Sequence, residues 1–508
     1  MSEPAETEGS AVDDDRAAAN VEAGGGASDA PAARLTAEPA PGPERHASWL
    51  ELFFDLVVVA GIGQLAHLLA VDSTAGGLGL YAVAFTAFWL VWACFTAYSN
   101  IVGDAVHTVT MLLGMACLGV MVAAVPEVHG EHARAFAIAY VVGRFVASKP
   151  WRAGTVVVDL PVLQASFGVL PWVVSIWVEG DLRYWLWAAG LAFDLLVLVS
   201  TTRERFVAET QRRLDRMADS MARRSAERRR RADTRSARSS RRPDAATDPR
   251  AATTGVGGAA ARADVGPDRG GPGRPRDRGI PGGPPDRGGP RNRELPMTPE
   301  VAGADLPHLA ERLSLFVLIV LGESLIQMIE GASEATWNRR LAVTALGAFV
   351  LITGLWAVAV RRGFAGVALL SAGAIAPRLA WVAHLLTTGA LATMAAVVAR
   401  LVEEPEAPVG DHDRWLIVAA FGVYGLGSAL VHVVVAQRAP SRPERRAGRV
   451  RALCVGVPVA VAVLLGAVRQ EPAAEGLVWT LALAVLAVIV ATARAARRIG
   501  GVLPPIHD

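Results

Sequence analysis

Twelve apolar stretches of near-transmembrane length restrict what this 508-residue chain can fold into. A helix needs roughly 20 apolar residues to cross ~30 Å of hydrocarbon, and most of the stretches reach that length. The mean hydropathy of +0.34 also excludes a soluble globular protein, which needs a charged surface. We therefore predict an all-α fold, a polytopic transmembrane helical bundle. The expected spans are 51–71, 79–99, 106–125, 133–148, 156–178, 184–201, 308–329, 341–360, 379–401, 413–437, 450–468 and 476–493. A further apolar stretch, 364–377, is expected to form a half-helix before the ninth span.

A long polar tract divides the spans into a 6+6 arrangement. Counted over 1–47 there are ten acidic residues against three arginines, and over 203–306 there are 24 arginines against 15 acidic residues. Neither tract can bury a core, so both are expected to be largely disordered. The predicted organisation is a disordered acidic N-terminal tail (1–47), a first membrane half (48–202), an Arg/Gly/Pro-rich cytoplasmic linker with a helical start (203–306), a second membrane half (307–498) and a C-terminal tail (499–508).

Loop charges predict the orientation of the bundle. With the N-terminus placed in the cytoplasm, the short cytoplasmic loops and the C-terminal flank carry fourteen basic residues and the opposite face carries seven. The positive-inside rule favours this arrangement. We expect a multi-pass membrane protein with both termini in the cytoplasm. An even number of spans per half would make the two halves parallel repeats, as in major facilitator transporters.

The start of the linker is a basic helix that suggests one partner besides the bilayer itself. Residues 203–232 lack Gly and Pro, and their arginines could bind anionic lipid head groups, since each juxtamembrane arginine adds roughly 1 kcal/mol. The alternative is a solvated extension of the sixth span. Nucleic acid is not an expected partner, because no aromatic residues are interleaved with the arginines to stack on bases. No sequence pattern predicts the oligomeric state.

Acidic residues inside the spans are the candidates for chemistry. Glu51 and Asp55 lie four residues apart, on one face of the first span. A charge near the bilayer centre costs at least ~2.5–3.5 kcal/mol and therefore faces a protein interior or a watery cavity. Glu323 in the seventh span lies deepest, and it shares a stripe with Gln327 and Glu330.

Arginines inside the spans are expected to balance these acids. Arg144 in the fourth span is the expected partner of Asp55 or Asp194. Interhelical hydrogen bonding, worth ~0.6 kcal/mol each, is the alternative reading of such polar residues. The complete predicted ion or substrate site is Glu51, Asp55, Arg144, Glu311, Arg312, Glu323 and Ser324.

Motifs of soluble enzymes do not occur in the sequence. Three cysteines cannot form a disulfide framework, and no Cys/His cluster predicts a metal site. A P-loop, a GxSxG elbow and an HExxH motif are missing as well. We expect no catalytic residues, no cofactor and no metal, and thus a protein that is not an enzyme.

Two blocks resemble the bacterial low temperature requirement A (LtrA) family. They are WLELFFDLVVVAGIGQLAHLL near the start and HLAERLSLFVLIVLGESL after the midpoint. The resemblance covers about 48–200 and 306–435 and departs at Leu313-Ser314, where the family usually has Phe-Gly, and around 361–378. It implies a polytopic protein of the bacterial plasma membrane that is associated with growth in the cold, without an established molecular activity.

Three functions are consistent with these features. The first is a secondary transporter in which Asp55 and Glu323 bind a proton or cation, Arg144 and Arg312 balance charge, and an unknown small solute or ion is carried. The second is a non-transporting membrane-adaptation or scaffold protein that supports growth at low temperature through its basic linker. The third is a membrane-embedded lipid-modifying enzyme, suggested only by acids and His308 near the interface.

Overall fold

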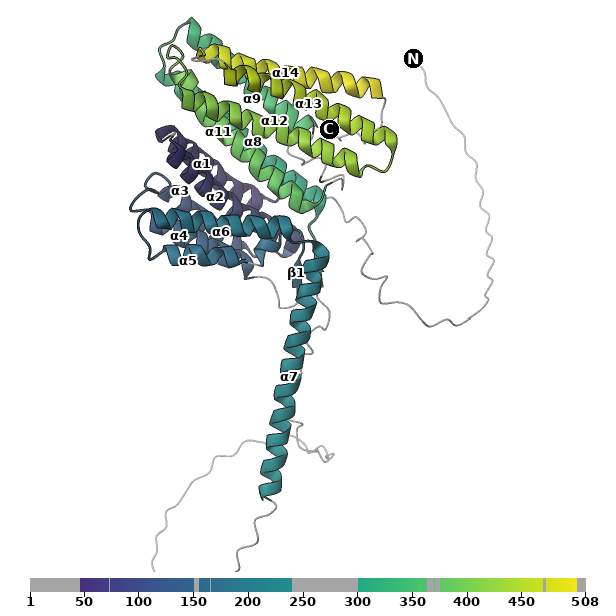
Figure 1. Ribbon diagram of the computed structural model, residues 1–508. Coiled ribbons are helices and arrows are strands. Elements are labelled where there is room, and N and C mark those ends of the chain that lie inside the picture. Colours follow the sequence, from purple (N-terminus) through teal and green to yellow (C-terminus); the bar gives the residue numbers. More distant parts are fainter. Residues whose placement is uncertain are drawn as a thin grey trace, which may run out of the picture. The chain divides into compact units, whose positions relative to one another are not determined.

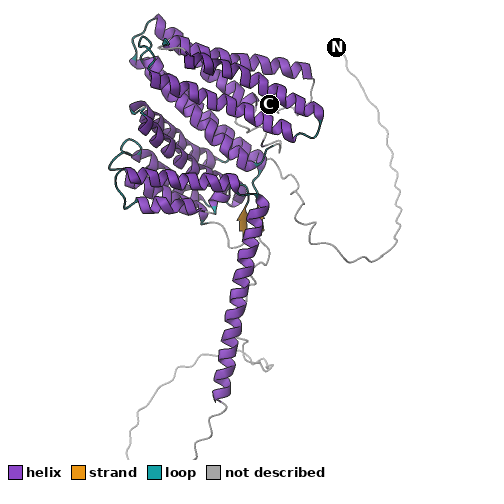
Figure 2. Cartoon of the chain, viewed as in Figure 1, coloured by secondary structure: helices purple, strands orange, loops and turns teal. Residues whose placement is uncertain are grey.

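A computed structural model describes residues 46–72, 74–149, 155–164, 166–239, 300–362, 370, 375–468 and 472–499. The predicted tails over 1–45 and 500–508, most of the linker after 239 and most of the half-helix over 364–377 lie outside these residues. The described chain is almost entirely helical (Figure 2). The predicted all-α, polytopic helical bundle is confirmed.

The first group of helices precedes the long polar tract (Figure 1). Its elements are α1 (Trp49–Val71), α2 (Ala75–Val102), η2 (Gly103–Ala105), α3 (Thr108–Ala124), α4 (Ala133–Ser148), β1 (Thr155–Val157), η3 (Pro161–Leu163), η4 (Ser166–Gly168), α5 (Val169–Ser175) and α6 (Asp181–Ser200). The long basic helix α7 (Arg203–Ser239) follows and covers the stretch expected to be helical.

The second group follows the tract. Its elements are β2 (Glu300–Ala302), α8 (Leu306–Glu334), α9 (Arg339–Arg362), α11 (Pro377–Glu403), α12 (Asp411–Arg438), α13 (Arg442–Val468) and α14 (Ala474–Ile499). Among the described residues, nine helices are long and apolar enough to cross a membrane, namely α1, α2, α6, α8, α9, α11, α12, α13 and α14. Helices α3 and α4 coincide with predicted spans but are shorter, with 17 and 16 residues.

One predicted span, 156–178, is not a continuous helix, and that expectation was wrong. The segment begins as strand β1, which pairs in parallel with β2, and continues as two 3-10 turns and the short helix α5. Pro161, at the start of the first 3-10 turn, has no amide hydrogen to donate. Side chains replace the missing helical bonds: Gln164 bonds the backbone of Thr155 and Val157, and Arg144 donates to the Val162 carbonyl. Irregular backbone is tolerated in a membrane protein where protein groups satisfy it in this way.

Helix starts follow from local side chains. Ser48 and Glu51 form a capping box at the start of α1, and Thr74 accepts a hydrogen bond from the Gly77 amide at the start of α2. In α8 the Asp305 side chain accepts from the His308 amide. These polar residues satisfy amides that a helix leaves without an internal partner.

The two groups meet along α1 and α2 on one side and α8 and α11 on the other (Figure 1). Helices α2 and α11 are the most buried of the spans. Their contact is aromatic: Trp89 and Trp92 of α2 pack edge-on against Trp381 of α11. Rings in this geometry stabilise a core beyond the area they bury.

Two glycines of α3 differ in how closely the first group of helices packs around them. A Cβ atom at Gly114 would lie 2.6 Å from the Phe95 ring, whereas one at Gly119 would meet nothing within 4 Å. Gly114→Ala should therefore destabilise the fold by about 1–3 kcal/mol through overpacking. Thermal unfolding of the detergent-solubilised protein measures this effect.

Gly119→Ala is the matched control on the same helix. Both substitutions gain helix propensity, so the control should leave the melting temperature unchanged or raise it. Equal melting temperatures for the two variants would contradict the packing described here.

Candidate functional site

A buried ion pair joins the two groups of helices. Asp55 of α1 accepts a hydrogen bond from Arg312 Nη2 of α8 at 2.9 Å, with side-chain exposures of 3% and 0%. The Trp92 indole donates to the same carboxylate oxygen at 3.0 Å. Asp55 is thus paired with Arg312 and not with Arg144, which corrects one of the two expected partnerships.

A second contact lies one helical turn away on the same two helices. His308 Nε2 of α8 lies 3.6 Å from Glu51 Oε2 of α1. Asn100 of α2 donates to His308 Nδ1 at 2.9 Å, so that nitrogen accepts, and Nε2 is the ring nitrogen directed at Glu51. The Glu51–His308 and Asp55–Arg312 contacts therefore lie one helical turn apart between α1 and α8.

A histidine of α11 extends this polar core. His384 Nδ1 accepts from the Trp89 indole at 3.0 Å, and its Nε2 lies 3.1 Å from the Leu313 carbonyl. A neutral imidazole with its proton on Nε2 satisfies both neighbours. Trp92 stacks on the ring with a centroid distance of 5.5 Å. The arrangement fixes His384 as a structural hydrogen-bonding group between α2, α8 and α11.

Arg144 belongs to a separate ion pair within the first group. Its Nη1 donates to Asp194 of α6 at 2.6 Å and to the Tyr140 hydroxyl at 2.9 Å, and both charged side chains are almost fully buried. A Cβ atom at Gly168 would lie 2.3 Å from Asp194, so only glycine lets the irregular segment approach the pair. Arg144 thus balances Asp194, the other expected partner, and anchors the broken segment.

Glu311 lies away from these pairs. Its side chain is about one-third exposed, at 35%, and His46 Nδ1 lies 3.6 Å away. Although Glu311 is adjacent to Arg312 in sequence, the two side chains differ sharply in burial, since Arg312 is fully buried.

An acidic cavity of about 860 Å³ lies between α1, α8 and α11. All three helices contribute their C-terminal halves, and helix C-termini carry partial negative charge. The carboxylates that line it are Glu323, Glu330, Glu334, Glu403 and Glu404. Arg400 is the arginine in the lining, and it bonds the Leu69 and Ala70 carbonyls and the Asp413 carboxylate. Five glutamates against one arginine make the cavity strongly attractive to cations.

Glu323 is the half-buried carboxylate of this cavity, whereas the other four glutamates are exposed. Gln327 Nε2 donates to Glu323 Oε1 at 3.1 Å. On the facing helix a Cβ atom at Gly63 would lie 2.5 Å from the same oxygen, so the α1 backbone approaches the carboxylate closely. Gln64 and His67 of α1 complete the polar lining.

Ser324 lies on another side of α8. Its hydroxyl donates to the Val320 carbonyl at 2.7 Å, and the residue borders a small apolar gap shared with α9 and α11. None of Glu51, Asp55, Arg144, Glu311, Arg312 and Ser324 lines the acidic cavity. The seven predicted site residues therefore do not converge on one place. The Asp55–Arg312 pair and the pair of Arg144 with Asp194 are both buried, Glu311 is peripheral, and Glu323 alone faces the cavity.

Three residues of the cavity near the end of α11 were not among the predicted site residues. They are Arg400, Glu403 and Glu404. Their positions just at the end of a long apolar run were the available signal. In the described part of the chain, no three His, Cys, Asp or Glu residues are placed to hold a metal ion.

These features define a multi-pass helical membrane protein with a bundle made of two groups of helices. The model of the bacterial low temperature requirement A protein (LtrA) family matches residues 46–228 and 290–495, which is more than half of the chain. The chain belongs to the LtrA family. The match is wider than the two quoted blocks predicted, because it includes the start of α7 and extends through most of α14. No curated protein and no solved structure matches the chain.

The buried Asp55–Arg312 pair is expected to stabilise the contact between the two groups of helices. Arg312→Met leaves Asp55 buried without its counter-charge, which should cost about 3–5 kcal/mol. The double variant Asp55→Leu/Arg312→Met removes both charges and should regain most of that loss. Thermal unfolding in detergent measures all three proteins.

Arg340→Met, at an exposed position in α9, is the control for loss of one arginine. It should unfold at the wild-type temperature. A double variant no more stable than Arg312→Met would show that the charge pairing is not what stabilises this contact.

Proposed function

We propose that the protein is a secondary transporter in which Glu323 binds a proton or a small cation at the inner part of the acidic cavity. One observation carries this proposal: a half-buried carboxylate lies in a large cavity whose other charged groups are mostly glutamates. Clefts lined by one sign of charge raise the local concentration of the oppositely charged solute. A protonatable group inside a membrane bundle is a common element of ion pathways.

The position of Gly63 supports a role for Glu323 in coupling. The carboxylate lies against the backbone of α1, so a change in its charge or ligand acts directly on the contact between α1 and α8. The same two helices are also joined nearer their N-terminal ends by Asp55 and Arg312. In this proposal Asp55 and Arg312 stabilise the contact between the two groups of helices, and Glu323 carries the exchangeable ion.

The proposed orientation follows from the loop charges. The acidic cavity lies at the C-terminal ends of α1, α8 and α11, which positive-inside counting assigns to the side opposite the cytoplasm. We propose that the cavity opens to the cell exterior in the plasma membrane. We propose transport and not catalysis as the activity, and the substrate class is a proton or inorganic cation with or without a co-transported solute.

Reconstitution into liposomes tests the proposal. Liposomes containing a pH-sensitive dye are exposed to gradients of protons, alkali cations and a panel of small solutes. The wild-type protein should give a flux with at least one gradient. Glu323→Gln removes the ionisable group while preserving size, and it should abolish that flux.

Glu334→Gln is the matched control, because it makes the same substitution on the same helix at an exposed position of the cavity. It should raise the half-saturating cation concentration only about 2–5-fold, and less at high ionic strength, because it weakens attraction without removing the site. Absence of wild-type flux with every gradient, or unchanged flux in Glu323→Gln, would contradict the proposal and favour a membrane-adaptation role without transport.

A further inference from the structure

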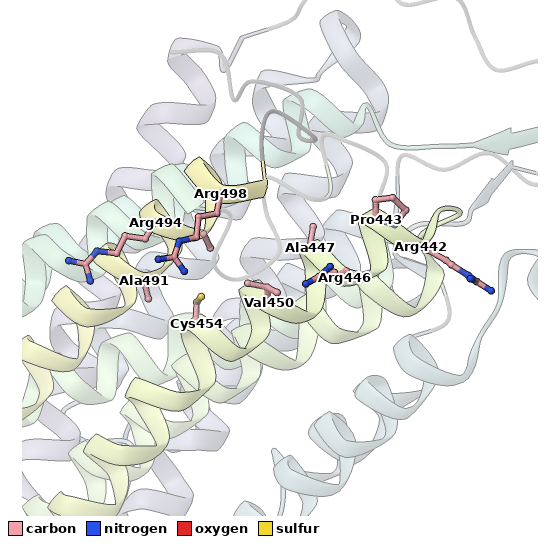
Figure 3. A pocket seen from close by; sticks show the side chains of 10 residues that line it. Arg442, Pro443, Arg446, Ala447, Val450, Cys454, Ala491, Arg494 and Arg498 are labelled. Carbon is pink, nitrogen blue, oxygen red and sulfur yellow. The ribbon is translucent and has the colours of Figure 1, made fainter.

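A second cavity, of about 970 Å³, lies between α13 and α14 at the other end of the second group (Figure 3). The two helices form an antiparallel pair, so the start of α13 lies beside the end of α14. Four arginines line the cavity, two from each helix: Arg442, Arg446, Arg494 and Arg498. Nothing in the proposed transport mechanism uses this cavity.

Among the described residues, the arginines of this basic cavity have no acidic partner. In the part of the chain that the structure describes, none of the four forms an ion pair. All four side chains are exposed. The nearest acid in sequence, Glu444, is not in the lining; its amide is bound by the Ser441 hydroxyl at the helix start. Four like charges around one cavity repel each other, and an anion bound between them would relieve that repulsion.

In the basic helix α7, by contrast, some arginines lie next to a carboxylate. There Glu209 lies within 3.5 Å of Arg212, Arg213 and Arg216, so three of its arginines share a carboxylate. Among the described residues, the basic cavity therefore concentrates positive charge without a paired carboxylate, unlike the part of α7 around Glu209. The partial positive charge at the start of α13 and the partial negative charge at the end of α14 oppose each other here, so the arginines supply the positive charge of the cavity.

Below the arginines the cavity is apolar. Its floor consists of Ala447, Val450 and Cys454 of α13 and Ala491 and Ala495 of α14. Their small size leaves room between the helices. Figure 3 shows Val450 and Cys454 of α13 and Ala491 of α14 in the same region as Arg446, Arg494 and Arg498, whereas the Arg442 side chain points away from them.

The apolar floor continues along α13 as an exposed stripe. Val450, Cys454, Val457 and Val461 follow each other at intervals of four, three and four residues, so they lie on one face of the helix. Val457 and Val461 are more than half exposed. In a membrane this face meets hydrocarbon, and an acyl chain that starts in the cavity can continue along it.

We propose that the basic cavity binds an anionic phospholipid, with its phosphate among Arg446, Arg494 and Arg498 and an acyl chain along the α13 stripe. Guanidinium groups match phosphate oxygens in geometry and charge. Basic pockets between membrane helices at the cytoplasmic side suit anionic head groups. A free phosphate would use the arginines alone, whereas the apolar floor adds specificity for a lipid.

Lipid binding to the full-length protein tests this proposal without any transport assay. Native mass spectrometry and competition with a fluorescent phospholipid compare phosphatidylglycerol, phosphatidylcholine and inorganic phosphate as ligands. Phosphatidylglycerol should bind more tightly than phosphatidylcholine, and inorganic phosphate should not displace it. The triple variant Arg446→Gln/Arg494→Gln/Arg498→Gln should weaken binding on the order of a hundredfold, given the usual contribution of each arginine.

Two further variants make the test specific. Arg223→Gln/Arg224→Gln/Arg228→Gln removes the same number of charges from α7 and should leave the binding at this site unchanged. Ala491→Leu fills the floor but keeps every arginine, so it should weaken phosphatidylglycerol binding. Circular dichroism and thermal unfolding confirm that each variant folds.

Three outcomes would overturn the proposal. Equal affinity for phosphatidylglycerol and phosphatidylcholine would show that the arginines do not select an anionic head group. Displacement by inorganic phosphate, with no effect of Ala491→Leu, would identify a simple anion site. Equal losses in the α7 variant and the cavity variant would show that only total charge matters.

Discussion

A charged side chain inside an apolar bundle must have a partner, and this constraint organises the structure. An unpaired charge in the membrane costs several kcal/mol, so every deeply buried acid has to meet a base. Asp55 meets Arg312 across the two groups of helices, and Asp194 meets Arg144 within the first group. The first pair fixes which face of α1 is turned to α8, and Trp92, which donates to Asp55, stacks on the His384 ring. The second pair holds the irregular segment that replaces a fifth membrane helix.

The carboxylates of the acidic cavity and the arginines of the basic cavity lie at opposite ends of the helical bundle. Successive helices of the second group reverse direction, so the ends that form the acidic cavity lie opposite the ends that form the basic cavity. Glutamates surround the ends of α1, α8 and α11, and arginines surround the start of α13 and the end of α14. The same asymmetry that predicts orientation from loop charges thus produces two chemically opposite cavities. One suits a cation and the other suits an anionic head group.

Much of the fold could be predicted because span length and hydropathy are local properties of the sequence. Eleven of the twelve expected spans coincide with described helices, and the i, i+4 spacing of Glu51 and Asp55 did place them on one face. The exception, 156–178, is as apolar as a span. Its course depends on distant groups, namely the Arg144 guanidinium, the β2 strand and the Ala304 amide that binds Asp159. Partner choice was unpredictable for the same reason: nothing local distinguishes Arg144 from Arg312 as the neighbour of Asp55. Depth along α8 did single out Glu323, while the contribution of α11 to its cavity required the packing of three helices.

Glu323 faces an open acidic cavity, whereas the ion pair on the same helix is buried. Cysteine accessibility measures this contrast directly, in a background in which Cys94, Cys117 and Cys454 are replaced by alanine. A cationic, membrane-impermeant methanethiosulfonate applied to intact cells should label Gln327→Cys in the cavity rapidly, and should not label Phe316→Cys beside the buried pair. Comparable labelling at both positions, or labelling at Phe316→Cys alone, would show that the Glu323 side of α8 is no more accessible than the ion pair.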